Sequence, residues 1–144
     1  MRLHVSTPQH NRSMKRRSLL ALPGLLFGAE ERSLRGKLVS GRKLQAGNRV
    51  VQLESDEPIG KVLDDERLLG SDFEVMGEPA GEGKFRIQEI HTKPLYVHVK
   101  GERLGVSYWC EVCYIRTYAP GKCWCCQEDT KLDPKDPNTP DRKP

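Results

Sequence analysis

Aromatic residues are scarce in this chain: they make up 6% of its 144 residues, and hydrophobic residues of all kinds make up 36%. A chain of this length forms one modest domain, and with so few aromatics its core must be small and mainly aliphatic. It also lacks an apolar run of about 20 residues, the length needed to cross a bilayer as a helix. The composition excludes a bundle of membrane helices and favours a soluble chain with irregular segments.

Acidic residues are absent from the first 29 positions, which hold five basic residues. The rest of the chain contains 19 basic and 20 acidic residues, so the formal net charge of +4 comes from this leader. Because the body of the chain has no basic excess, there is no electrostatic argument for nucleic acid as a partner.

The leader has the parts of a secretory signal. Met14 is followed by Lys15, Arg16 and Arg17, and then by an apolar run that ends at Ala29. A basic start, a short apolar stretch and small residues before a polar break are typical of such signals. We therefore expect residues 1–29 to be an upstream extension plus a signal segment at about 14–29, with Met14 as the true start. The expected location is the periplasm or the exterior of a bacterial cell, without a transmembrane anchor.

Short runs of alternating apolar residues, separated by Gly and charged turns, fill the middle of the chain. Only 59–69 has a helical pattern, with Pro58 suited to a first turn and Gly70 to the end. Several short strands and one helix predict a mainly β domain over 30–109, a small barrel whose closure removes exposed strand edges. The expected strands are 34–39, 49–54, 72–77, 84–91, 95–100 and 104–109.

Parts of this region resemble the OB-type barrel domains of exported bacterial proteins. The similar segments are Arg35–Val39, Val50–Leu53, Leu69–Gly77 and Phe85–Ile90, which fit a pattern L-x-G-x-x-x-V-x-G leading into G-x-F-x-V-x-x-I. The resemblance covers roughly residues 33–92 and implies an OB-like barrel with one short helix. It implies no catalytic residue, since barrels of this kind have many functions.

All five cysteines lie between positions 110 and 126. Cys110 and Cys113 form one pair with two residues between them, Cys123 and Cys126 form a second, and Cys125 is left over. Two-residue spacing lets both thiolates of a pair face one cation, and four sulfurs at about 2.3 Å make a tetrahedral site that suits zinc. Iron, or copper(I) with Cys125 as an extra ligand, also suits sulfur ligation.

The sequence therefore predicts a metal-binding, zinc-ribbon-like hairpin over 110–126. In this hairpin a strand at 114–118 and a turn at 119–122 bring the two cysteine pairs together. Two alternatives use the same residues. An exported chain meets an oxidising compartment, where two disulfides and one free thiol would form. The order Trp109-Cys-x-x-Cys113 also resembles a thioredoxin active site, but that site needs a following helix and the residues after Cys113 favour a strand.

Other polar residues give weaker indications. His91 and His98 can face each other across Pro94 and join a metal site, although a surface histidine is the more common outcome. The acidic run at 64–66 predicts a solvated helix face, and the Pro-rich, charged tail at 127–144 predicts disorder. No phosphate-binding loop or nucleophile elbow occurs, so enzyme activity has no residue set to rest on.

Taken together, these patterns predict an exported, non-enzymatic binding or structural module with a zinc site on an OB-like barrel. Its partner is expected to be a protein or a small ligand. The alternative function is that of a periplasmic protein that exchanges disulfides or handles copper(I) with the same cysteines.

Overall fold

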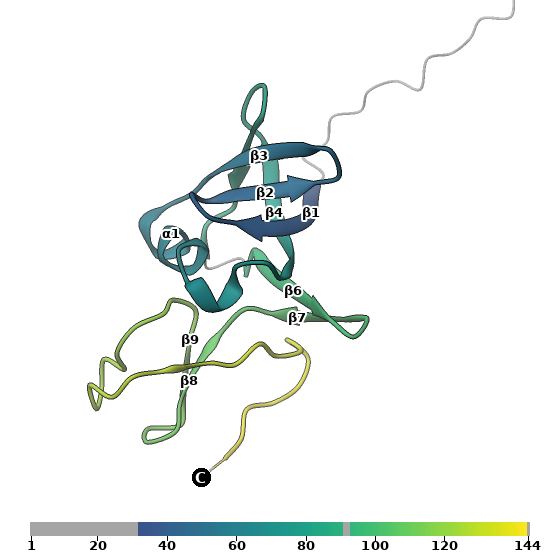
Figure 1. Ribbon diagram of the computed structural model, residues 1–144. Coiled ribbons are helices and arrows are strands. Elements are labelled where there is room, and N and C mark those ends of the chain that lie inside the picture. Colours follow the sequence, from purple (N-terminus) through teal and green to yellow (C-terminus); the bar gives the residue numbers. More distant parts are fainter. Residues whose placement is uncertain (1–31, 91–92, 144) are drawn as a thin grey trace, which may run out of the picture.

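The computed structural model describes residues 32–90 and 93–143 (Figure 1). The expected upstream extension and signal segment, 1–29, lie outside the described residues, and so does His91. Among the helices that are described, none has the length and apolar character needed to cross a membrane.

Within the described residues, five strands close into a small barrel. Their hydrogen-bonded order is β1-β2-β3-β5-β4, and β1 also pairs antiparallel with β4, which closes the ring. Every neighbouring pair is antiparallel except β3 with β5. The bounds are β1 Arg32–Val39, β2 Lys43–Ala46, β3 Arg49–Glu54, β4 Asp72–Pro79 and β5 Lys84–Ile87.

A short helix, α1 (Glu57–Leu63), connects β3 to β4 and is followed by a 3₁₀ turn, η1 (Glu66–Leu68). The Asp56 side chain caps α1 by accepting a hydrogen bond from the Ile59 backbone N–H at 3.0 Å. Proline in the first turn adds no unsatisfied donor, because the first N–H groups of a helix have no partner within it. The apolar face of α1 is buried in the barrel core.

That core is aliphatic with few aromatics, as the composition predicts. It contains Leu38, Leu44, Leu53, Ile59, Val62, Leu63, Leu68, Phe73, Val75, Phe85, Ile87, Leu95, Val97, Val106 and Tyr108. Tyr108 is the one member that belongs to the cysteine-bearing part of the chain, so it anchors that part to the barrel.

Beyond the barrel, β6 (Leu95–Val99) and β7 (Glu102–Gly105) form a hairpin that extends the sheet from β4. A second sheet of the described chain has the order β10-β8-β9, with β8 Tyr108–Cys110, β9 Ile115–Thr117 and β10 Lys131–Leu132. In Figure 1 this sheet lies below the barrel, and the yellow C-terminal segment crosses β8 on its way to β7. The prediction of a mainly β fold with a small barrel, one helix and a C-terminal cysteine cluster is confirmed.

The element boundaries differ from the prediction in physically understandable ways. The segment 43–46 becomes β2, a strand of only four residues in which Leu44 alone is buried, so its alternation is too short to mark it as a strand. The expected strand 104–109 is divided between β7 and β8, because the chain leaves the barrel sheet at Val106 and Ser107. The strand expected at 84–91 ends at Ile87 as β5.

The C-terminal tail corrects the prediction of disorder. The Lys135 backbone exchanges two hydrogen bonds with Gly105, at 2.8 and 3.0 Å. Arg116, whose side chain is only 9% exposed, forms ion pairs with the Asp133 carboxylate at 2.9 Å and the Asp141 carboxylate at 2.7 Å. The tail is held by backbone pairing and by ion pairs to Arg116, neither of which requires the apolar residues whose absence led to the prediction.

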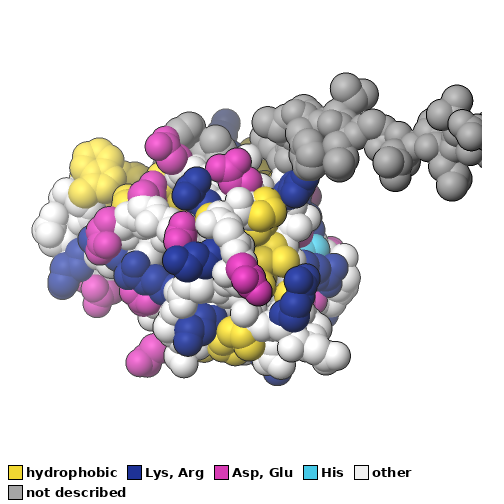
Figure 2. All heavy atoms as spheres, turned by 90° about the horizontal axis from the view of Figure 1, so that it is seen from above, with side chains coloured by type: hydrophobic (Ala, Val, Ile, Leu, Met, Phe, Trp, Pro, Cys, Tyr) yellow, Lys and Arg dark blue, Asp and Glu magenta, His cyan; other side chains and the backbone are white. Residues whose placement is uncertain are grey.

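The face in Figure 2 shows basic and acidic side chains interspersed, with apolar groups in separate patches. No broad area of one sign covers this face.

Candidate metal centre

The first cysteine pair lies in the tight turn between β8 and β9. Cys110 is the last residue of β8 and pairs with Ile115 of β9. The Tyr114 backbone N–H donates to the Cys110 carbonyl at 2.9 Å, and the Cys113 N–H points to the Cys110 Sγ at 3.4 Å. Tyr114 adopts a φ of +55°, which turns the chain back into β9.

The second pair repeats this geometry. The Gln127 backbone N–H donates to the Cys123 carbonyl at 2.8 Å, and Gln127 has a φ of +63°. The Cys123 N–H donates to the Glu128 carbonyl at 2.7 Å, which closes the base of the turn. In both turns the residue after the second cysteine is left-handed and bonds back to the first cysteine. Two equivalent turns therefore present their sulfurs in the same way.

The four paired sulfurs converge on one point. The Sγ atoms of Cys110, Cys113, Cys123 and Cys126 all lie within 4.8 Å of one another, and Cys110 Sγ is 3.5 Å from Cys126 Sγ. Four sulfurs at about 2.3 Å from a central ion would be about 3.8 Å apart. Cys110 and Cys123 are buried, and Cys113 and Cys126 are half-buried. The arrangement can hold a metal ion.

Hydrogen bonds favour the thiolate form of one cysteine of this centre, Cys123. Backbone N–H groups of Cys126 and Cys125 donate to the Cys123 sulfur and lower its pKa to about 7. Interaction with the Cys125 thiol, together with burial, raises the pKa of Cys113. Cys125 is exposed and lies beside the four sulfurs without being one of them. All five residues are free thiols.

The way in which the pairs meet differs from the expected hairpin. The predicted strand at 114–118 is present as β9, but it pairs with β8 and not with the second cysteine turn. After that second turn the chain returns as β10 and pairs with the other edge of β8. The two turns are therefore brought together by a three-stranded sheet centred on β8. A strand, and not a helix, follows Cys113, so the thioredoxin arrangement is excluded.

His98 takes no part in the cluster. Its Nε2 lies 2.7 Å from a carboxylate oxygen of Glu74, and Arg103 also pairs with this carboxylate at 2.9 Å. All three residues belong to the barrel sheet and its β6–β7 extension. Burial would raise the Glu74 pKa, but the hydrogen bonds from Arg103 and His98 outweigh it and keep this pKa below its usual value.

Two residues make important contacts that the sequence did not predict. Asp65 was expected on a solvated face, yet its side chain is only 6% exposed and accepts the Tyr108 hydroxyl at 2.8 Å. Arg116 links Ser107, Asp133 and Asp141. No local pattern predicts these contacts, because Tyr108 is distant from Asp65 in the chain, and Asp133 and Asp141 are distant from Arg116.

Comparison with known proteins gives no similarity: no family model, no curated protein and no solved structure matches the chain. The function must therefore be argued from the site.

Proposed function

We propose that Cys110, Cys113, Cys123 and Cys126 bind one zinc ion, and that the protein is an exported, non-enzymatic binding or structural module. The observation that carries the proposal is the convergence of these four sulfurs within 4.8 Å. They come from two turns of equal geometry, and the unpaired Cys125 is not among them.

Zinc fits the chemistry of this ligand set. It prefers four tetrahedral ligands in structural sites, and a complete set of thiolates leaves no open position for a substrate. Such a site holds elements together and does not catalyse a reaction. Iron also accepts four thiolates, so metal analysis is needed to distinguish the two.

The position of the site supports a structural role. Cys110 ends β8, whose first residue, Tyr108, is fully buried in the barrel core. Metal binding would fix β8, β9 and the second turn to one another and, through Tyr108, to the barrel. Because such a site cannot form in the unfolded chain, the free energy of metal binding adds to the free energy of unfolding.

We also propose that the barrel is of the OB type. The order β1-β2-β3-β5-β4 with closure onto β1, the parallel β3–β5 pair and the helix between β3 and β4 support this. Barrels of this type bind diverse ligands, so the fold supports a binding module without naming its ligand.

The metal is tested by elemental analysis and native mass spectrometry of the protein and of five single Cys→Ser variants. We expect about one equivalent of zinc in the unmodified protein and loss of most of it when any of the four paired cysteines is changed. Cys125→Ser is the matched control, because it removes a thiol from the same turn and should retain the metal. Equal loss in this control, or full retention in Cys110→Ser, would contradict the assignment.

The alternative is a thiol-disulfide or copper(I)-handling protein. One observation favours it: the Cys125 thiol is exposed and contacts Cys113 at the edge of the cluster. If the protein exchanges disulfides, Cys125→Ser should abolish the reaction of its thiols with an oxidant. If it handles copper(I), the purified protein should contain copper in place of zinc. Unreactive thiols and stoichiometric zinc would reject it.

Export is the remaining part of the proposal and is supported by the leader alone. Protein sequencing of the chain recovered from its host should find an N-terminus near Glu30 in the periplasm or medium. An intact chain that starts at Met1 in the cytoplasm would contradict export while leaving the metal assignment untouched.

A further inference from the structure

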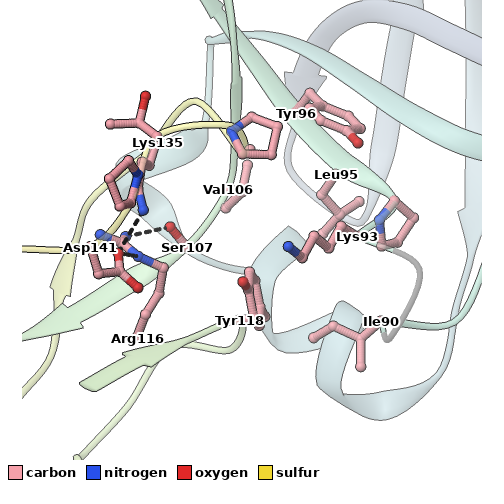
Figure 3. A pocket seen from close by; sticks show the side chains of 15 residues that line it. Ile90, Lys93, Leu95, Tyr96, Val106, Ser107, Arg116, Tyr118, Lys135 and Asp141 are labelled. Atoms are coloured by element: carbon pink, nitrogen blue, oxygen red, sulfur yellow. Dashed lines mark hydrogen bonds and ion pairs between the residues drawn. The ribbon is translucent and has the colours of Figure 1, made fainter.

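A cavity of about 260 Å³ lies where the β6–β7 hairpin, β9 and the C-terminal segment meet. It is separate from the cysteine cluster, none of whose residues lines it. Its floor is apolar and includes Pro94, Leu95 and Val106, and the Tyr118 ring forms part of its rim. Figure 3 shows the side chains of Leu95, Val106 and Tyr118 around one open space. An apolar cavity with a few polar groups at its edge is the usual form of a small-molecule site.

One wall of the cavity carries charged groups that are paired with each other. The Asp141 carboxylate pairs with Arg116 and with Lys135, each at 2.7 Å. Arg116 also pairs with the Asp133 carboxylate at 2.9 Å, and Arg142 approaches the same carboxylate at 3.4 Å. These contacts, some of which are drawn as dashed lines in Figure 3, pair the charged groups of this wall with one another, so each of them already has a partner within the protein.

The opposite wall carries a positive charge that is not neutralised. The Lys93 ammonium lies 5.7 Å from the centroid of the Tyr118 ring, and no carboxylate among the described residues forms an ion pair with it. In Figure 3 its side chain reaches from the opposite wall into the open space. The cavity thus combines an apolar floor, an aromatic rim and one cationic group, Lys93, that has no ion-pair partner among the described residues.

We propose that this cavity binds a small monoanion with a compact apolar body, specifically an apolar carboxylate. The carboxylate would pair with the Lys93 ammonium, and the apolar body would lie against Val106, Leu95 and the Tyr118 ring. A single ammonium suits one negative charge, whereas a phosphate group would leave a second charge unpaired. The volume lies just below the range of about 300–1,000 Å³ found for drug-sized ligands, which indicates a smaller molecule.

The test uses phenylacetate as the probe and the full, metal-loaded chain. Titration followed by amide chemical shifts should show saturable binding with a dissociation constant below about 5 mM, with the largest shifts at Val106, Tyr118 and their neighbours. Phenylacetamide has the same shape without the charge and should bind at least about tenfold more weakly, because a charge-assisted hydrogen bond is lost.

Lys93→Met should reduce phenylacetate affinity by at least about tenfold. This exposed position tolerates the change, since methionine keeps a similar apolar stem. Lys61→Met is the matched control: Lys61 lies on α1 and does not line the cavity, so affinity should be unchanged. Absence of saturable binding, equal binding of phenylacetamide, or an unchanged affinity in Lys93→Met would each overturn the proposal. None of these results depends on which metal the cysteines hold.

Discussion

Tyr114 and Gln127 occupy the same place in the two cysteine turns, and both have a left-handed backbone. This conformation costs about 1–2 kcal/mol for a residue with a Cβ, and glycine avoids it. Neither position is glycine in this chain. Tyr114 compensates in part by packing edge-on against Trp109, with ring centroids 6.0 Å apart. Gln127 is exposed and has no such packing, so its backbone strain is not offset and a glycine at this position would relieve it.

We predict that Gln127→Gly increases the free energy of unfolding by up to about 1 kcal/mol and leaves the metal content unchanged. The relief of backbone strain is partly offset by the greater entropy of glycine in the unfolded chain. Urea denaturation of the metal-loaded protein measures the effect. Gln127→Ala is the control, because it removes the same side chain and keeps the strain. A glycine variant no more stable than the alanine variant would contradict the prediction.

The contact between Asp65 and Tyr108 predicts a pH-dependent contribution to stability. Burial would raise the Asp65 pKa, but hydrogen bonds from Arg67 and Tyr108 outweigh it and hold this pKa below its usual value. A carboxyl whose pKa is depressed on folding stabilises the fold above its unfolded pKa of about 3.9. That contribution is lost as the pH falls through the lower folded pKa.

Tyr108→Phe should therefore lower the free energy of unfolding by about 1.5–3 kcal/mol at pH 7, where the hydroxyl bonds to a carboxylate. The difference between wild type and variant should shrink as the pH approaches 3. Chemical denaturation of both proteins at each pH measures this difference. Acid removes the metal from wild type and variant alike, so metal loss has little effect on the difference between them. A difference of equal size at both pH values would show that the Asp65 charge is not involved.

At the scale of the elements, two glycines allow barrel strands to approach closely. A Cβ at Gly36 of β1 would collide with the Gln45 carbonyl of β2, and one at Gly77 of β4 would collide with the Arg86 carbonyl of β5. Because backbone atoms cannot move aside as flexible side chains do, these glycines are required by the barrel geometry and not by a turn.

We expect Gly77→Ala to lower the free energy of unfolding by at least about 2 kcal/mol, as strain in a packed strand does. Gly105→Ala is the comparison, since a Cβ there meets its nearest atom, the Lys135 carbonyl oxygen, at an ordinary 3.4 Å. Guanidinium denaturation of both variants provides the measurement. Equal losses in the two would indicate a general effect of replacing strand glycines.

The sequence could predict those elements whose signals are local. Strand β3 was predicted at its observed bounds, 49–54, and Pro58 marked the start of α1, although the helix ends at Leu63 and not at 69. The spacing of the cysteines identified two turns because a two-residue interval nearly determines the geometry of each. Strand β2 was not predicted, because Leu44 is its only buried apolar residue. Pairing with the neighbouring strands β1 and β3 supplies the rest of its stability.

Contacts between distant residues could not be read from the sequence. Arg116 is one of 24 basic residues, and nothing in its surroundings shows that Asp133 and Asp141 will meet it. The composition of the tail predicted disorder because the tail has few apolar residues to bury. It is ordered instead by backbone pairing and ion pairs. The cavity depends on the same long-range contacts and therefore could not be predicted from the sequence either.

For the whole molecule, the tail is expected to contribute to stability. Truncation after Asp133 removes Lys135 and Asp141, and with them the backbone pairing to Gly105 and one ion pair of Arg116. We predict a fall in melting temperature of about 5–10 °C. Truncation after Asp141 is the control, because it retains these contacts. Thermal unfolding of both should separate them, and equal melting temperatures would mean that the tail contacts stabilise little.

The cysteine cluster and the cavity share strand β9, which begins two residues after Cys113 and carries Arg116 toward the cavity wall. If both proposals hold, metal and carboxylate should bind with positive coupling, and each should increase the affinity of the other by the same factor. Titrating phenylacetate into the metal-loaded and the chelator-treated protein measures that factor. Identical affinities in the two forms would show that β9 is ordered without the metal.

The ion pairs of Asp141 also have a practical consequence for protein preparation. They place the end of the described chain on the wall of the cavity. A polypeptide extends at most about 3.6 Å per residue, so an affinity tag joined three residues beyond Asp141 would begin within about 11 Å of it. A polyhistidine tag at this end would bring metal-binding imidazoles and extra charge next to the opening. Ligand screens and metal analyses are therefore best carried out on protein whose C-terminus carries no added sequence.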